Sequence, residues 1–139
     1  MIVSLHVASG AAAGVLLESR LGALMAGPVL HVLGDRIPHH DIPSRRFETW
    51  TGIGALALVA LRHGPLSAAT LGGVAASVPD VEHVLRLPQP GGRKLFPSHR
   101  VLGWHRSGGL RAWVQLGAAG LLLGFVLAAR SRPSTRAPI

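Results

Sequence analysis

The sequence predicts an all-α, membrane-embedded bundle of four to five short helices joined by polar loops. Apolar residues make up 48% of the 139 residues and charged residues only 14%, against about 25% in an average soluble domain. Five stretches contain no Asp, Glu, Lys or Arg. A chain of this length is expected to form one domain, which spans residues 1–139.

Each uncharged stretch is expected to form a helix, and the five stretches are residues 1–17, 21–34, 49–61, 63–79 and 112–129. The first carries Ser9, Gly10, Ala13 and Gly14 at helical spacing, which predicts a face for close packing against another helix. Pro28 is expected to kink the second. Residues 62–65, Arg-His-Gly-Pro, predict a turn between the third and the fourth.

The last stretch gives the clearest prediction of a membrane span. A helix that crosses the hydrocarbon core needs about 20 apolar residues, in a range of about 17 to 25. Ala112–Ala129 is uncharged, lies between Arg111 and Arg130, and has Trp113 near one end, where an interfacial aromatic residue is expected. We therefore expect a C-terminal transmembrane helix over residues 111–130 and a basic tail over residues 131–139.

The net charge of +8 raises the question of nucleic acid. Only six aromatic residues are present, too few for a base-stacking platform, and the basic residues lie between and after the apolar stretches. Anionic lipid headgroups suit this distribution better. We expect a lipid bilayer as the partner, no nucleic acid, and a location in an inner (cytoplasmic) membrane of the prokaryotic type. The absence of Cys excludes a disulfide scaffold and a thiolate zinc finger.

The acidic side chains lie close to histidines. Eight His accompany six acidic residues, four of which are within four positions of a His. His31 and Asp35 are four apart, so on a helix both side chains lie on one face. Pro38 is expected to end that helix and to turn His39 and Asp41 back toward the first pair.

A second cluster lies in residues 78–83. If Pro79 opens a helix, Asp80 and His83 share one of its faces, and Glu82 points elsewhere. Asp80 has a plainer interpretation as a helix cap.

His99 and His105 form a third cluster, and each is followed by an arginine, Arg100 and Arg106. Forked guanidinium hydrogen bonds suit phosphate or carboxylate, so these two arginines are expected to hold an anion. They also fit contacts with lipid headgroups. His6 stands alone in the apolar first stretch.

Imidazole and carboxylate groups together favour a divalent metal site. Zn²⁺ is the preferred ion, and Mn, Fe or Ni fit the same donors. The expected metal ligands are His6, His31, Asp35, Asp80, His83, His99 and His105. The expected catalytic residues are His39, Asp41, Arg100 and Arg106. These residues lie in a metal-site region that covers residues 1–110.

The order of the motifs resembles a known family. An early His6, the run Pro79-Asp80-Val81-Glu82-His83, and His99-Arg100 with His105 and Ser107 are similar to the YdjM-like group of small membrane-bound metal-dependent hydrolases. The resemblance covers residues 1–110, with Glu82 where the family usually has Asp and Trp104 where Thr is common. The spacing of His31 and Asp35 is also similar to ligand spacing in the zinc phospholipase C and S1/P1 nuclease group.

The resemblance implies a membrane-bound metal-dependent hydrolase that acts on a phosphoester or a phospholipid-type substrate. One alternative is a non-enzymatic membrane protein with a structural or transport metal site. Another is a helical scaffold for a membrane partner. A single site requires residues 36–48 and 80–108 to lie on one face of the membrane.

Overall fold

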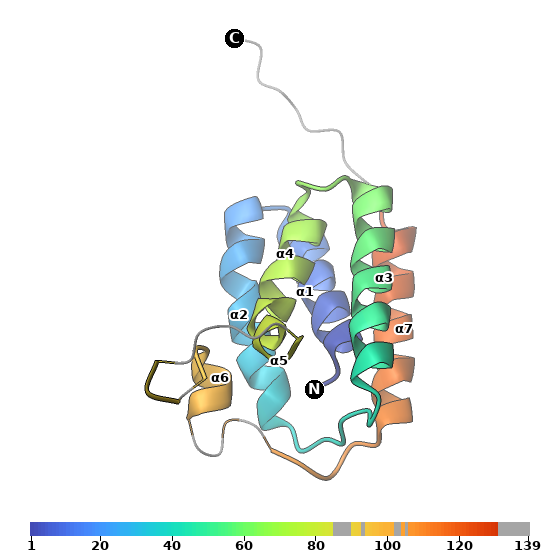
Figure 1. Cartoon of the computed structure of the whole chain (residues 1–139). Helices are drawn as coiled ribbons and strands as arrows, with labels where there is room; N and C mark the ends of the chain where they lie inside the picture. Colours follow the sequence, from blue (N-terminus) through green and yellow to red (C-terminus); the bar gives the residue numbers. More distant parts are fainter. Residues whose placement is uncertain (85–89, 93, 102–103, 105, 131–139) are drawn as a thin grey trace.

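The computed structural model describes residues 1–84, 90–92, 94–101, 104 and 106–130. This part of the chain forms helices and no strands. The all-α class is therefore confirmed. Figure 1 shows the five longer helices side by side. They are α1 (Val3–Leu17), α2 (Arg20–Arg36), α3 (Arg45–His63), α4 (Ala68–Ser77) and α7 (Ala112–Ala128).

Four short elements follow α4 and gather at one end of the bundle. They are η1 (Val78–Asp80), α5 (Val81–Val84), η2 (Pro90–Gly92) and α6 (Pro97–Arg100). The N-terminus of the chain and the loop from α2 to α3 lie at the same end (Figure 1). The loop from α2 to α3 and these short elements therefore lie at the same end of the bundle (Figure 1).

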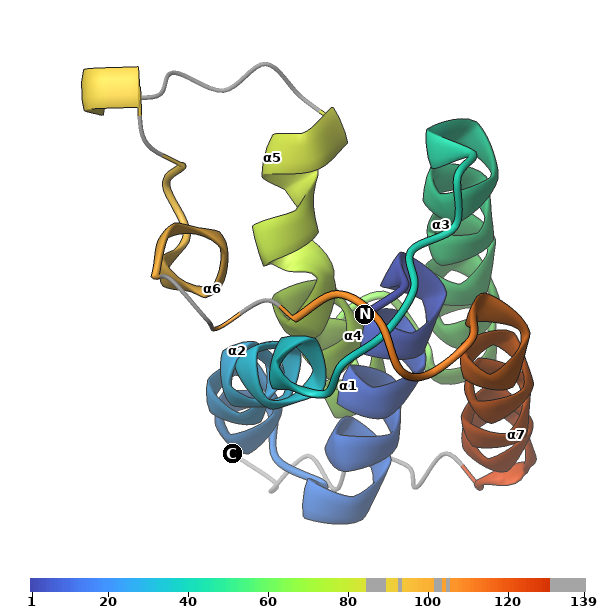
Figure 2. The same ribbon diagram turned by 90° about the horizontal axis from the view of Figure 1, so that it is seen from below.

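Helix α1 lies at the centre and contacts α2, α3, α4 and α7 (Figure 2). Its contact with α4 depends on residues without large side chains. A Cβ atom at Gly10 would lie 2.2 Å from the carbonyl oxygen of Gly72, and one at Gly14 would lie 2.1 Å from that of Ala68. The two backbones therefore touch along the small-residue face that the sequence predicts, and this contact fixes the start of α1 beside the end of α4.

The helix boundaries follow local chemistry. α3 begins at Arg45, four residues before the uncharged stretch, because the hydroxyl of Ser44 accepts a hydrogen bond from the Phe47 backbone N–H at 3.3 Å. α3 ends at the predicted turn, where Gly64 takes a φ of 93° that suits glycine. Pro28 lies inside α2, which continues as one helix on both sides of it.

Among the described residues, none of the helices is both long and apolar enough to cross a bilayer. The predicted transmembrane helix over residues 111–130 forms α7, which has 17 residues. The membrane-embedded part of the predicted fold class is therefore not supported.

Candidate metal centre

Ionisable side chains from four elements meet at the end of the bundle where α4 finishes. His6 comes from the first turn and a half of α1, and His31 and Asp35 come from successive turns of α2. Asp80 ends η1, and His99 belongs to α6. A metal ion requires several ligand atoms close together. Among the described residues, three overlapping groups have ligand atoms within 4.8 Å of one another: His6, His31 and Asp80; His31, Asp35 and His99; Asp80, His83 and His99.

Asp35 lies at the middle of this cluster. Its Oδ1 is 3.1 Å from Nε2 of His6, and its Oδ2 is 3.2 Å from Nε2 of His31 and 3.6 Å from Nε2 of His99. The α-amino group of Met1 also lies 2.5 Å from Oδ1. Three imidazole nitrogens therefore surround one carboxylate.

Asp80 faces the same space from the opposite side. Its Oδ1 is 3.7 Å from Nε2 of His99 and its Oδ2 is 4.0 Å from Nε2 of His6. Ligands of a tetrahedral ion at about 2.0–2.1 Å are about 3.3 Å apart. Nearest separations of 3.1 to 4.0 Å between the donor atoms in this cluster are close to that spacing.

The outer nitrogens of the rings are held by groups that can only accept hydrogen bonds. Nδ1 of His31 donates to the carbonyl oxygen of Ala76 at 2.8 Å, and Nδ1 of His39 donates to that of Ile37 at 2.7 Å. Because a carbonyl cannot donate, the proton is on Nδ1, and in a neutral ring Nε2 carries a lone pair. Metal-binding histidines are oriented in this way.

Glu82 does the same for His99. Its Oε1 accepts a hydrogen bond from Nδ1 of His99 at 2.5 Å, and its Oε2 accepts one from the Leu95 backbone N–H at 2.8 Å. The sequence predicts that Glu82 points away from its neighbours Asp80 and His83. It is instead buried behind His99 and directs Nε2 of that ring at Asp35 and Asp80.

The cluster is buried, and several of its polar atoms lack partners. His6 and His31 are 0% exposed and Asp35 is 1% exposed. Among the described residues, Nδ1 of His6, Nε2 of His31 and Oδ2 of Asp80 make no hydrogen bond. Buried polar atoms are normally satisfied. Nε2 of His31 and Oδ2 of Asp35 are 3.2 Å apart but are not aligned for a hydrogen bond. This arrangement fits two lone pairs that point toward a shared cation.

The electrostatics indicate the same missing charge. Burial lowers the pKa of His6 to about 3 and raises the pKa of Asp80 to about 6. Burial opposes protonation of His31 too, but its contact with Asp35 and the charge of Asp80 outweigh burial and raise its pKa. Two buried carboxylates need positive charge nearby. The Met1 ammonium supplies one positive charge beside Asp35, and a divalent cation held by these donors would balance the remaining carboxylate charge.

His39 lies at the edge of the cluster and is held by a clamp of backbone hydrogen bonds. Its N–H donates to the carbonyl oxygen of Arg106 at 3.2 Å, and its own carbonyl accepts from Gly108 at 2.9 Å. Its Nε2 is 2.5 Å from the Met1 amine and 3.3 Å from Oδ1 of Asp41. Backbone hydrogen bonds thus join the segment that contains Arg106 and Gly108 to the end of α2 and to the residues just after it.

Other predicted site residues are exposed or lie apart from the buried donors, although His83 shares a donor group with Asp80 and His99. His83 is exposed and contacts the ring of His99 at a centroid distance of 4.3 Å. Arg100 and Arg106 are exposed and do not line the cavity beside the cluster, so the structure does not place them as its anion contacts. His105 lies outside the described residues.

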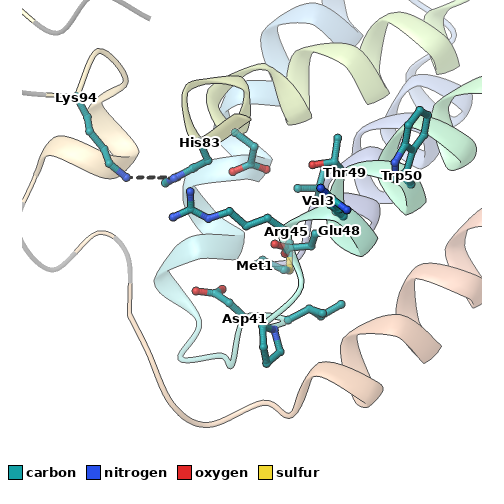
Figure 3. A pocket seen from close by; sticks show the side chains of 13 residues that line it. Met1, Val3, Asp41, Arg45, Glu48, Thr49, Trp50, His83 and Lys94 are labelled. Atoms are coloured by element: carbon teal, nitrogen blue, oxygen red, sulfur yellow. Dashed lines mark hydrogen bonds between the residues drawn. The ribbon is translucent and has the colours of Figure 1, made fainter. Parts of the chain in front are cut away.

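A cavity of about 710 Å³ opens next to Asp80 and His83 (Figure 3). Its wall includes Glu48, whose pKa is raised to about 7 by burial and by the charges of Asp41 and Asp80. The sequence analysis passed over Glu48 because no His lies near it in the chain. The signal available was its position directly before the third uncharged stretch, in a polar segment that forms the first turn of α3.

Comparisons with models of protein families, with curated proteins and with solved structures gave no match. The resemblance to the YdjM-like group therefore stays a prediction.

Proposed function

We propose that the chain is a metal-dependent hydrolase of phosphoesters. The observation that carries the proposal is the convergence of three imidazole Nε2 atoms, from His6, His31 and His99, on the carboxylates of Asp35 and Asp80. A hydrogen-bonded cluster without an ion leaves buried atoms of this set unsatisfied. Zn²⁺ is the ion that we favour, and Mn, Fe or Ni would accept the same donors.

The residues of the cluster would divide the work as follows. His6, His31, His99, Asp35 and Asp80 hold the ion. A bound divalent ion acidifies water and polarises a phosphoryl oxygen. Hydrolysis adds the oxygen of water to phosphorus and breaks the ester P–O bond, and the departing alcohol oxygen takes up a proton.

Glu48 is placed to handle that proton. It lines the cavity beside Asp80, and a pKa of about 7 lets it both give and accept a proton near neutral pH. His39 and Asp41, which the sequence analysis expected to be catalytic, face each other at 3.3 Å at the edge of the cluster. They are the second pair able to exchange a proton with the site.

Burial of the cluster favours one second candidate, a structural metal site. His6 and His31 are fully buried and, with the buried Asp80, form one group of three possible protein ligands, and Asp35 lies 3.1 Å from His6 and 3.2 Å from His31 as a fourth donor. A closed site with four protein ligands is structural, whereas a catalytic site keeps a position for water. The cavity that reaches Asp80 and His83 favours the open arrangement.

We also propose that the protein is membrane-associated. Large apolar side chains on the outer faces of the long helices are exposed to solvent, among them Leu21, Met25, Trp50, Leu61, Trp113 and Leu121. An exposed apolar surface spread over several helices is characteristic of a membrane or protein partner. Flotation of the purified chain with liposomes that contain anionic lipid tests this: the chain should float with them, and recovery in the dense fraction would oppose the proposal.

Hydrolysis is tested with the metal-loaded chain and two chromogenic substrates, p-nitrophenyl phosphate and bis(p-nitrophenyl) phosphate. Asp35→Asn should lower turnover by about a hundredfold or more, since it removes a charge from the centre of the donor set. His40→Ala is the matched control, because His40 is exposed beside the cluster and is not one of its donors. Metal that binds without turnover of either substrate favours the structural site.

A further inference from the structure

The cavity beside the metal centre is lined by two chemically different kinds of side chain. Asp80 and His83 stand at its inner edge, where they also belong to the donor groups of the cluster. Figure 3 shows His83 and Lys94 at one end of the cavity and Trp50 at the other. A molecule in this cavity therefore lies against the metal ligands. The volume of about 710 Å³ is within the range of small-molecule sites, about 300–1,000 Å³.

Three cations line the cavity. Arg45 and Arg46 come from the first turn of α3, and Lys94 comes from the segment after η2. In the part of the chain that the structure describes, none of the three forms an ion pair with a carboxylate. The ammonium group of Lys94 lies 3.3 Å from Nδ1 of His83.

Two of the three carboxylates that line the cavity contact histidines, and the third, Glu48, has a pKa raised to about 7. Asp41 lies 3.3 Å from the ring of His39, and Asp80 faces His99 and His6. The cations that line the cavity are therefore available to an external anion. Arginine and lysine side chains bind phosphate oxygens through charge-assisted hydrogen bonds, which are stronger than neutral ones.

Apolar side chains also line the cavity. These are Val3, Ile42, Pro43 and Trp50. Trp50 is 69% exposed and begins a strip of exposed apolar side chains along α3. The strip continues with Ile53, Ala57 and Leu61, which follow at spacings of three and four and so share one helix face.

We propose that this cavity binds a phosphate ester that carries an alkyl or acyl chain. The phosphate lies between Arg45, Arg46 and Lys94, next to the metal centre, and the chain passes Trp50 onto the apolar strip of α3. The proposal rests on the proposed function, because it supplies the substrate for the hydrolase. It moves the anion contact from Arg100 and Arg106 to residues of α3 and the segment after η2.

Binding is measured by calorimetry on the full chain, with and without Zn²⁺, using phosphonates whose C–P bond is not hydrolysed. Hexylphosphonate should bind at least tenfold more tightly than methylphosphonate, because only the longer chain reaches the apolar side chains. It should also bind at least tenfold more tightly than hexanoate. Equal affinity for the three probes would overturn the proposal.

Variants separate the two kinds of side chain. Arg45→Glu and Lys94→Gln should weaken both phosphonates by about tenfold, whereas Trp50→Ala should weaken hexylphosphonate and leave methylphosphonate unchanged. Arg20→Glu is the control for charge reversal, because Arg20 begins α2 at the opposite end of that helix from Asp35. Loss of binding in Arg20→Glu equal to that in Arg45→Glu would contradict the assigned phosphate contacts.

The outcome is distinguishable from that of the proposed function. Chain-dependent phosphonate binding without turnover of any phosphoester leaves the cavity assignment standing and removes the hydrolase. If the chromogenic esters are turned over but phosphonate binding depends on neither chain length nor Lys94→Gln, the hydrolase stands and the cavity assignment is removed.

Discussion

Oε1 of Glu82 accepts a hydrogen bond from Nδ1 of His99 at 2.5 Å, and Nε2 of the same ring lies 3.6 Å from Asp35 and 3.7 Å from Asp80. The carboxylate fixes both the tautomer and the direction of the ring. Burial opposes the charged form of Glu82, but the hydrogen bonds from His99 and the Leu95 backbone outweigh burial and lower its pKa. Glu82 is therefore ionised at neutral pH and acts as a positioning residue.

Glu82→Gln should weaken metal binding by about 10- to 100-fold, the usual effect of losing a group that orients a ligand. The amide has one acceptor oxygen, so it cannot serve both His99 and the Leu95 N–H. Affinity is measured by competition with a chromogenic chelator. Glu18→Gln is the control, since Glu18 caps the far end of α1. Equal affinity in Glu82→Gln and wild type would refute the positioning role.

Metal affinity should fall as the pH is lowered through about 6. Burial raises the pKa of Asp80 to about 6 in the metal-free chain, so a proton competes with the ion for this carboxylate below that pH. Chelator competition from about pH 8 to about pH 5 measures the effect. Asp80→Asn should bind more weakly at pH 8 and show a shallower dependence. A slope as steep in Asp80→Asn as in wild type would assign the protons to other groups.

Glu48 should destabilise the metal-free fold at high pH. A carboxyl group whose pKa rises from 4.5 unfolded to about 7 folded binds its proton more tightly in the fold, so stability is lost as the pH rises between these values. Glu48→Gln lacks this loss. After allowance for partial exposure, we expect the variant to be about 1 kcal/mol more stable than wild type at pH 8 and about equal at pH 4. Urea unfolding at both pH values measures the difference, and a variant that is less stable at pH 8 would show that the Glu48 carboxylate stabilises the fold.

The contact between α1 and α4 should tolerate no side chain at Gly10. A Cβ atom there would lie 2.2 Å from the Gly72 carbonyl oxygen and 2.6 Å from Cβ of Ala76, so the helices must move apart. Gly10→Ala is expected to cost about 1–3 kcal/mol of unfolding free energy. Gly117→Ala in α7 is the matched control, because a Cβ atom there meets nothing within 4 Å, and it should be neutral or stabilising. Equal effects of the two substitutions would count against the close packing.

The sequence was a good guide where local rules decide the structure. The five longer helices follow the uncharged stretches, and the i,i+4 spacing of His31 and Asp35 puts both side chains in the cluster. His39, which is expected to be a site residue because it follows Pro38, is 2% exposed, whereas the next residue, His40, is exposed. Such spacings act within one helix or one turn, so a single sequence reveals them.

Contacts between residues of different helices could not be predicted from the sequence in the same way. The partner of Glu82 is His99, 17 positions later and in another helix. No histidine motif stands next to the cavity's cations in the sequence; these are Arg45, Arg46 and Lys94. Arg100 and Arg106 each follow a histidine in the sequence but do not line the cavity. The predicted span over residues 111–130 is not supported because the helix that forms there has 17 residues, and among the described helices none is both long and apolar enough to cross a bilayer.

Metal content of the purified chain tests the central claim most directly. Elemental analysis after loading with Zn²⁺ or Mn²⁺ and removal of excess ion should give at least about one ion per wild-type chain. Asp35→Ala should retain almost none, and His40→Ala should match wild type. A wild-type chain that retains no stoichiometric metal after either ion is offered would contradict the assignment of His6, His31, Asp35, Asp80 and His99 as a metal centre.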